Sequence, residues 1–255
     1  MAIVAIIQAR MSSSRLRGKV MLPLAGQPVI HHVVSRIQRS RKISQVVVAT
    51  TFDERDNIID EWCFVNKVQC YRGNMNDLLD RYYQCAKLFS ADAILRITAD
   101  CPLIDCETVD EVIEGFFSDD YALYSLQGEF PDGLDCEVFS FNALERAWRE
   151  AKLPSEREHV GPYIKNNPNV FKVGGLRKFT GMSNIRLTLD EPEDYEFLTR
   201  LFSELSDKQK PISLQDVVAL LAARPDLQLL NSHIVRNQGY QESLKLDKDS
   251  RQSRR

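Results

Sequence analysis

The sequence predicts an α/β fold built on a mostly parallel central sheet, with a small inserted lobe. In the N-terminal half, short apolar runs of strand length alternate with segments whose apolar residues recur at helical spacing. The run at 3–9 is continuously apolar and the run at Gln45–Thr51 is rich in β-branched residues, and both patterns are typical of strands buried on two faces. This alternation favours parallel strands joined by right-handed crossovers. Because no Pro/Gly/Ser-rich linker divides the chain, we expect one continuous core.

The remaining elements follow from the same two patterns. Strands are predicted at 3–9, Gln45–Thr51, 68–72, Ala93–Thr98, Glu137–Ser140, 171–174 and 185–189, with a strand and loop within 119–133. Helices are predicted at Val29–Ile37, 56–65, 77–89, 105–117 (with Asp105 as N-cap), 142–152, 193–205 and Leu214–Ala223. We expect residues 241–255 to form a disordered tail, because they include five basic and three acidic residues and almost nothing apolar.

Composition excludes several classes of protein. The 255 residues include 33 Lys+Arg and 36 Asp+Glu, and a net charge of −3 argues against a protein that mainly grips nucleic acid. The sequence has no run of 18 apolar residues, the length needed to span a membrane. Its apolar start is too short for a signal peptide. Six cysteines without a Cys-x-x-Cys pair are expected to be reduced thiols rather than zinc ligands. We therefore expect a cytoplasmic protein with no nucleic-acid or membrane partner.

The loop after the first strand is the strongest candidate for a ligand site. Residues 10–19 include four cations, three serines and one glycine, and no acid. In open parallel sheets the ligand crevice lies beyond the carboxyl ends of the strands, where this loop would stand. Its small residues would let backbone N–H groups approach phosphate oxygens, and its cations would neutralise phosphate charge. The alternative is a solvated basic turn. Ser13 and Val20 depart from the Walker A pattern and no Gly-x-Gly-x-x-Gly occurs, so a different triphosphate loop is needed.

Two aspartates follow predicted strands. Asp100 comes just after Ala93–Thr98, and Asp190 just after 185–189. Mg²⁺ commonly binds one or two carboxylates together with substrate phosphates and water, which suits residues at this edge of a sheet. Each aspartate could equally be a helix N-cap, and the Glu-Pro that follows Asp190 fits a cap well. The residues alone leave both possibilities open.

The opening of the chain resembles a known family of enzymes. The segments 7–10 and 15–19, followed by Gly26-Gln27-Pro28 before a helix, are similar to the opening of the cytidylyltransferases that make CMP-activated sugar acids. The spore-coat polysaccharide biosynthesis (SpsF-like) subgroup is the nearest match, and the resemblance covers about residues 1–205. It implies a Rossmann-like, GT-A-like nucleotidyltransferase fold, which we assign as one domain over residues 1–240. Arg17 stands where the family usually has Pro, and Ser12 where Gly is frequent.

The resemblance also implies roles for individual residues. Nucleotide binding falls to Ala9, Arg10, Ser14, Arg15, Lys19, Asp77, Arg81 and Thr98, with Arg10 and Lys19 also catalytic. Asp100 and Asp190 become the Mg²⁺ ligands, and Asp135, His159 and Arg186 are candidates for contact with the acceptor. Plainer alternatives stay open for several of them. Asp77 and Arg81 could each belong to a helix cap or a surface salt bridge, and Asp135 could simply be part of a turn. His159 could be a surface histidine, and Arg186 could be a buried arginine that pairs with a carboxylate.

These expectations describe a Mg²⁺-dependent enzyme that transfers CMP from CTP to a small sugar acid and releases pyrophosphate, in surface polysaccharide or glycan biosynthesis. The family also suggests a homodimer. One alternative is a glycosyltransferase that uses a nucleotide sugar, although the only Asp-x-Asp, at 247–249, lies in the expected tail. A second alternative is a nucleotide-binding protein without turnover in a sugar-assembly complex.

Overall fold

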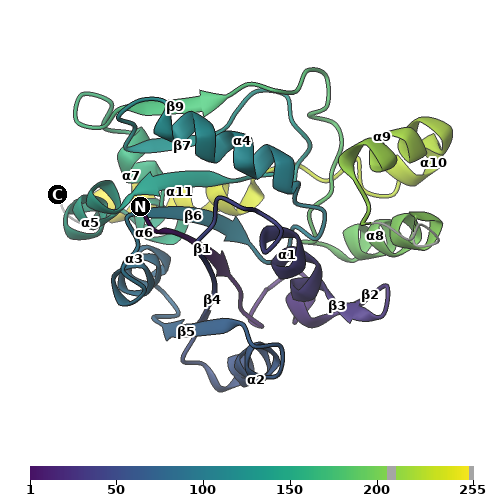
Figure 1. Ribbon diagram of the computed structural model, residues 1–255, viewed down its shortest axis with the longest axis horizontal. Helices are drawn as coiled ribbons and strands as arrows, with labels where there is room; N and C mark the ends of the chain where they lie inside the picture. Colours follow the sequence, from purple (N-terminus) through teal and green to yellow (C-terminus); the bar gives the residue numbers. More distant parts are fainter. Residues whose placement is uncertain (206–210, 253–255) are drawn as a thin grey trace.

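The central sheet has seven strands and is mostly parallel, as predicted. A computed structural model describes residues 1–205 and 211–252 of the chain (Figure 1). The strand order is β5 (Gln69–Gly73), β4 (Gln45–Thr51), β1 (Ile3–Gln8), β6 (Ala93–Thr98), β8 (Glu137–Ser140), β7 (Leu123–Leu126) and β9 (Val173–Leu176). Strand β8 runs antiparallel to β6 and β7, and the other neighbours pair in parallel.

The parallel strands end together, and this edge positions the site. Gln8 is opposite Thr98 at the end of the β1–β6 pair, and Thr51 is opposite Gly73 at the end of the β4–β5 pair. Strand β1 lies in the middle of the parallel group and is buried on both faces, which explains its continuous apolar sequence. The loop that follows β1 therefore emerges at the centre of this edge.

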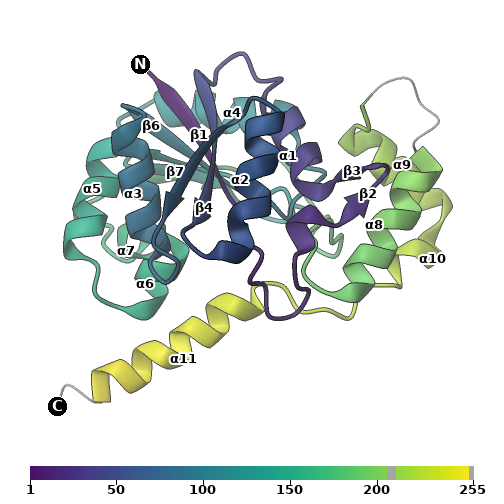
Figure 2. The ribbon, with the colours of Figure 1, turned by 90° about the horizontal axis from the view of Figure 1, so that it is seen from below.

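Helices cover both faces of the sheet (Figures 1 and 2). One core holds residues of α1 (Val29–Ile37), α2 (Asn57–Val65) and α4 (Cys106–Phe117), together with α8 (Pro192–Leu205), α9 (Leu214–Ala223) and α10 (Pro225–Gln228). The opposite core holds residues of α3 (Leu78–Leu88), α5 (Phe141–Glu150) and α7 (Pro162–Lys165), and α6 (Pro154–His159) lies beside α3. Two short strands, β2 (Pro23–Leu24) and β3 (Gln27–Pro28), pair beside α8, and single 3-10 turns stand at Lys19–Met21 (η1) and Glu54–Asp56 (η2). Asp105 caps α4 through the Thr108 N–H, as predicted.

The predicted strand at 185–189 is not a strand of the sheet. The segment is buried and extended, but its backbone pairs with loop residues. The Asp132 N–H donates to Ile185 O at 2.9 Å and the Leu187 N–H donates to Asp132 O at 2.7 Å. At its end, the Leu189 N–H donates to Asp100 O at 2.8 Å. The segment has the alternating pattern of a strand, yet it forms a buried connection because its partners are single loop residues rather than a neighbouring strand.

The expected disordered tail differs from the structure over residues 241–252, which belong to helix α11 (Gln238–Gln252) (Figure 2). Its polar side chains bond to residues of α6, of which Ser155 is buried. Asp247 accepts hydrogen bonds from the Ser155 N–H at 2.9 Å and the Ser155 hydroxyl at 2.6 Å, and Ser243 contacts His159 Nε2 at 3.0 Å. The composition predicted disorder because composition contains no information about hydrogen bonds between residues far apart in the sequence. Residues 253–255 lie outside the described part of the chain. Within the described residues, no helix is long and apolar enough to cross a membrane.

Candidate active site

The cationic loop leaves the end of β1 and is closed by its own backbone. Ala9 is buried and its N–H donates to Ala49 O on β4 at 3.2 Å. At the far side of the loop, the Gly18 N–H donates to Met11 O at 3.0 Å. Gly18 has a φ of 67°, and a Cβ there would lie 3.0 Å from Met11 Cε, so a side chain would strain the turn that presents Lys19. The loop is therefore held at both ends.

A buried aspartate that the sequence analysis did not single out holds the start of this loop. Asp56 is 1% exposed, and its Oδ1 accepts the Met11 N–H at 2.7 Å. Its Oδ2 accepts the N–H of Thr51 at 3.2 Å and the Thr51 hydroxyl at 2.5 Å. In the sequence Asp56 reads as the first residue of a helix, and nothing local indicates a partner 45 residues away. Asp56 thus joins the ends of β1 and β4.

Lys19, Asp100 and Asp190 meet beyond the ends of β1 and β6. The Lys19 ammonium lies 2.5 Å from Asp100 Oδ2 and also bonds Asp190 Oδ1. Burial by itself would lower the pKa of Lys19, but the two carboxylates outweigh it and raise the pKa above its ordinary value. Burial would likewise raise the pKa of Asp100, yet the Lys19 charge outweighs burial and lowers it. One cation is therefore shared by two carboxylates.

Arg15 joins the same group from the other side of the loop. Its Nη2 lies 3.1 Å from Asp190 Oδ2 and its Nε lies 3.2 Å from Glu191 Oε1. Arg15 Nη1 donates to Gln238 of α11 at 3.1 Å, so the C-terminal segment also reaches this edge. Two of the loop cations assigned to phosphate thus contact carboxylates of the chain in this structure.

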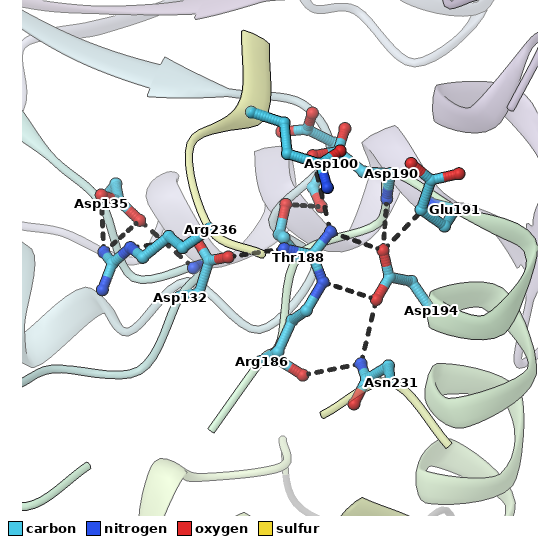
Figure 3. A network of polar contacts seen from close by, with 12 residues as sticks. Asp100, Asp132, Asp135, Arg186, Thr188, Asp190, Glu191, Asp194, Asn231 and Arg236 are labelled. Atoms are coloured by element: carbon cyan, nitrogen blue, oxygen red, sulfur yellow. Dashed lines mark hydrogen bonds and ion pairs between the residues drawn. The ribbon is translucent and has the colours of Figure 1, made fainter. Parts of the chain in front are cut away.

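Asp190 is held in place by a buried ion pair (Figure 3). Asp194 is fully buried and accepts two hydrogen bonds of 2.8 Å from the guanidinium of Arg186. Asp194 Oδ2 also accepts the N–H groups of Asp190 at 2.9 Å and Glu191 at 3.0 Å. Asn231 donates to Asp194 Oδ1 at 3.0 Å. Arg186, a predicted acceptor residue, therefore pairs with carboxylates of the chain. This agrees with its plainer interpretation, a buried arginine that is the partner of a carboxylate.

Arg10, Arg17 and Arg81 are cations of this region without a carboxylate partner among the described residues, and two of them are residues predicted to bind the nucleotide. Arg10 is exposed at the end of β1, and Ser14 is exposed in the same loop. Arg81 is only 3% exposed, yet its Nε and Nη1 atoms have no hydrogen-bond partner. Burial, together with the charge of Arg10, lowers the pKa of Arg81 to about 10. A buried guanidinium that lacks partners is costly unless a ligand supplies them.

Two other predicted nucleotide residues have local partners. Asp77 caps α3 through the Asp80 N–H at 2.9 Å and also accepts from Arg157 Nε at 2.9 Å. Both plainer interpretations of Asp77, a cap and an ion pair, thus describe its contacts. The Thr98 hydroxyl lies 3.1 Å from Cys101 Sγ at the end of β6. Thr98 is near Asp100 in the chain and belongs to the same sheet edge.

The predicted acceptor residues divide into two groups. Asp135 lies in the turn before β8, where Arg236 Nη2 donates to its Oδ1 at 2.9 Å and its Oδ2 at 3.1 Å (Figure 3). Arg236 also stacks on Phe130 at 4.3 Å, and the sequence analysis did not identify it. His159 instead ends α6 and packs against Tyr240 of α11. Its pKa is lowered by burial, which makes the neutral imidazole the favoured form.

Asp132 adds a second carboxylate beside Asp135. Arg186 Nη1 donates to Asp132 Oδ2 at 2.7 Å, and Arg236 Nε lies 3.5 Å from Asp132 Oδ1. Burial, and then the charge of Asp135, raise the pKa of Asp132 to about 6. This corner of the site is therefore acidic and is neutralised by two arginines from distant parts of the chain.

The donor set suits one divalent cation bound together with a ligand. Asp100 and Asp190 direct oxygens at a common point, which the Lys19 ammonium holds in this structure. Across residues 1–205 and 211–252, no group of three or more His, Cys, Asp or Glu side chains could hold a metal by itself. Two carboxylates completed by phosphate oxygens and water are a usual Mg²⁺ environment. The residues fit a metal that arrives with a phosphate ligand.

Comparisons with known proteins agree with the fold. Residues 4–220 match a family model described as cytidylyltransferase. The spore coat polysaccharide biosynthesis protein SpsF of Bacillus subtilis is 32% identical over 229 residues, which cover 87% of this chain and 94% of that protein. A 3-deoxy-manno-octulosonate cytidylyltransferase of Geobacter sulfurreducens is 35% identical over 113 residues, 44% of each chain.

A solved structure extends this agreement to three dimensions. A cytidylyltransferase from Leptospira borgpetersenii superposes with a TM-score of 0.84 and 34% identity, over 89% of this chain and 96% of that one. These matches confirm the resemblance seen at the start of the sequence and the nucleotidyltransferase fold that it implied. The family match covers most of the chain, including the loop after β1 and both Asp100 and Asp190. The chain therefore belongs to the cytidylyltransferase family and is a nucleotidyltransferase.

Proposed function

We propose that this enzyme transfers CMP from CTP to a hydroxyl of a sugar acid, with Mg²⁺ held by Asp100 and Asp190. The observation that carries the proposal is the meeting of Lys19, Asp100 and Asp190 beyond the ends of two parallel strands. Nucleotide binding is supported by exposed Arg10 and buried Arg81, two cations that have no carboxylate partner among the described residues. The sugar-acid acceptor is supported by the names of the two relatives, one in polysaccharide biosynthesis and one acting on 3-deoxy-manno-octulosonate.

The chain's own residues would act mainly by position and charge. The acceptor hydroxyl would attack the α-phosphorus of CTP in line and release its proton to water, so that the new P–O bond forms while the bond to the pyrophosphate oxygen breaks. Arg10, Arg15 and Lys19 hold the triphosphate and stabilise the charge that develops on the leaving pyrophosphate. A bound Mg²⁺ neutralises phosphate charge at the same place. Arg186 and Asp194 act through Asp190 by fixing the backbone that carries it.

The acceptor would occupy the acidic corner next to this site. Asp135 lies there and accepts hydrogen bonds from Arg236. The remaining lone pairs of its carboxylate could accept hydrogen bonds from sugar hydroxyls. His159 lies against α11 through Ser243, and a role in acceptor binding requires the acceptor to reach that helix. The glycosyltransferase alternative gains no support from the Asp-x-Asp at 247–249, because Asp247 is buried and bonded to Ser155.

The test begins with thermal unfolding in the presence of CTP, UTP, GTP or ATP, each with and without Mg²⁺. A ligand at about 100 times its Kd stabilises the folded state by about 2.7 kcal/mol, which gives a clear shift. We expect a shift that is selective for CTP and larger with Mg²⁺. A panel of sugar acids is then screened for pyrophosphate release.

Each outcome separates the alternatives. Pyrophosphate release with one sugar acid supports the proposal. Selectivity for another nucleotide would remove the cytidylyl assignment. CTP binding without pyrophosphate release from any acceptor would favour a binding protein, and turnover of a nucleotide sugar without pyrophosphate would favour a glycosyltransferase.

A further inference from the structure

Two of the three loop cations that would bind the triphosphate are engaged by the carboxylates that would bind the metal. Lys19 bonds Asp100 and Asp190, and Arg15 bonds Asp190 and Glu191. The Lys19 side chain is 12% exposed, so its contact with the carboxylates is largely shielded from water. A divalent cation needs the same carboxylate oxygens and would be repelled by an ammonium at that point. The two cations therefore compete for one position.

The carboxylates are fixed and the lysine is the partner that can move. Asp100 is joined to the 185–189 segment through its carbonyl and Leu189, and the backbone of Asp190 is held by buried Asp194. Lys19 follows Gly18 at the start of a three-residue 3-10 turn and carries its charge on a flexible four-carbon stem. Rotation of this stem removes the ammonium from the carboxylates without a change in the backbone.

We propose that Lys19 closes the metal site of the nucleotide-free enzyme and that the triphosphate opens it. Phosphate oxygens draw the Lys19 ammonium, and with it Arg15, away from Asp100 and Asp190, which frees both carboxylates for the divalent cation. The metal then binds with the nucleotide and not before it, and each strengthens the binding of the other by the same factor. This inference rests on the proposed function, because it takes Asp100 and Asp190 as the metal ligands.

The test measures Mn²⁺ binding directly, by the loss of the free Mn²⁺ signal in electron paramagnetic resonance, with no acceptor and no turnover. The proteins are wild type, K19M and the control K42M, which removes a lysine that pairs with Glu114 near the start of β4, away from the site. Without nucleotide, we expect K19M to bind Mn²⁺ at least about tenfold more tightly than wild type, and K42M to match wild type. With CTP, after correction for Mn²⁺ bound to free CTP, wild type gains affinity, whereas cytidine gives no gain.

Further variants make every result decisive. The double variant K19M/D100N is expected to lose the gain in Mn²⁺ affinity, which assigns it to this site. K19R keeps the charge and is expected to behave as wild type. If K19M does not fold, as judged by thermal unfolding, K19Q and the comparison of CTP with cytidine in wild type decide the question.

The proposal would be overturned by wild type binding Mn²⁺ alone as tightly as the lysine variants, with CTP adding nothing. Mn²⁺ binding that needs CTP equally in wild type and K19M would also overturn it, but would leave the metal site in place. Failure of every protein to bind Mn²⁺ even with CTP would instead refute the metal ligands of the proposed function.

Discussion

The guanidinium of Arg186 and the carboxylate of Asp194 form a two-point ion pair that is buried beneath the candidate metal site. The side chains are 7% and 0% exposed, so neither charge is solvated by water. Asp194 in turn fixes the backbone next to the site, because its carboxylate accepts hydrogen bonds from the N–H groups of Asp190 and Glu191. The pair is thus a support for Asp190, and the following predictions test it together with the residues it positions.

Removal of Arg186 should destabilise the protein strongly. R186M leaves the Asp194 charge buried without its main partner, and we expect the free energy of unfolding to fall by about 3–5 kcal/mol. The matched control is R224M, because Arg224 pairs with Asp226 while both side chains are largely exposed, and an exposed pair contributes about 0–1 kcal/mol. Urea unfolding of the three proteins measures the difference. Equal losses in R186M and R224M would contradict the role of the buried pair.

Loss of Lys19 or of a metal carboxylate should lower turnover and leave the fold intact. We expect K19A and D100N to reduce the rate of pyrophosphate release by about 100-fold or more, the scale of losing one preorganised electrostatic contact. K42M serves as the control and should retain most of the rate, because Lys42 pairs with Glu114 near the start of β4, away from the site. Near-normal rates in both K19A and D100N, measured at saturating CTP and Mg²⁺, would show that the assignment is wrong.

Arg81 should matter for the nucleotide and not for the fold. Its buried Nε and Nη1 atoms lack partners, so R81M should leave the melting temperature of the free protein unchanged or higher while reducing the shift caused by CTP. The control R72M should do the opposite, because Arg72 donates to Thr51 O at 2.8 Å and Asp53 O at 2.9 Å. A destabilised R81M that still shows the full CTP shift would make Arg81 structural.

Asp132 should give the stability of the protein a specific pH dependence. The pKa of Asp132 is about 6 in the folded protein, whereas the ordinary value for an aspartate is 3.8. The folded state therefore holds the proton more tightly than the unfolded state does. The stabilisation is complete below pH 3.8 and is lost as the pH rises through about 6. Two pKa units correspond to a change on the order of 3 kcal/mol.

The comparison with D132N isolates this effect, because asparagine cannot lose a proton. Urea unfolding at pH 4 and pH 7 should show wild type losing stability relative to D132N as the pH rises. A difference between the two proteins that stays constant over this range would mean that Asp132 titrates normally.

Local pattern was sufficient for much of the fold. The continuous apolar run of β1 and the β-branched run of β4 predicted buried parallel strands, and both lie inside the sheet. The helix at Val29–Ile37 and the Asp105 cap also follow from spacing within a few residues. The same strand boundaries placed the cationic loop and Asp100 at one edge, where the structure has them. Apolar periodicity and caps are properties of neighbouring residues, so a sequence carries them directly.

Contacts between distant segments could only be decided by the tertiary structure. The segment at 185–189 has the pattern of a strand, yet its hydrogen bonds go to Asp132 and Asp100, and this places Asp190 beside Lys19. Asp56 and Arg236 have no local signal, because their partners lie 45 and 101 residues away. The polar composition of α11 predicted disorder, whereas in the structure α6 provides hydrogen-bond partners for its side chains. The sequence by itself determined which segments are buried and where charge is concentrated, whereas packing decided which charges meet, because an ion pair depends on distance in space and not on separation along the chain.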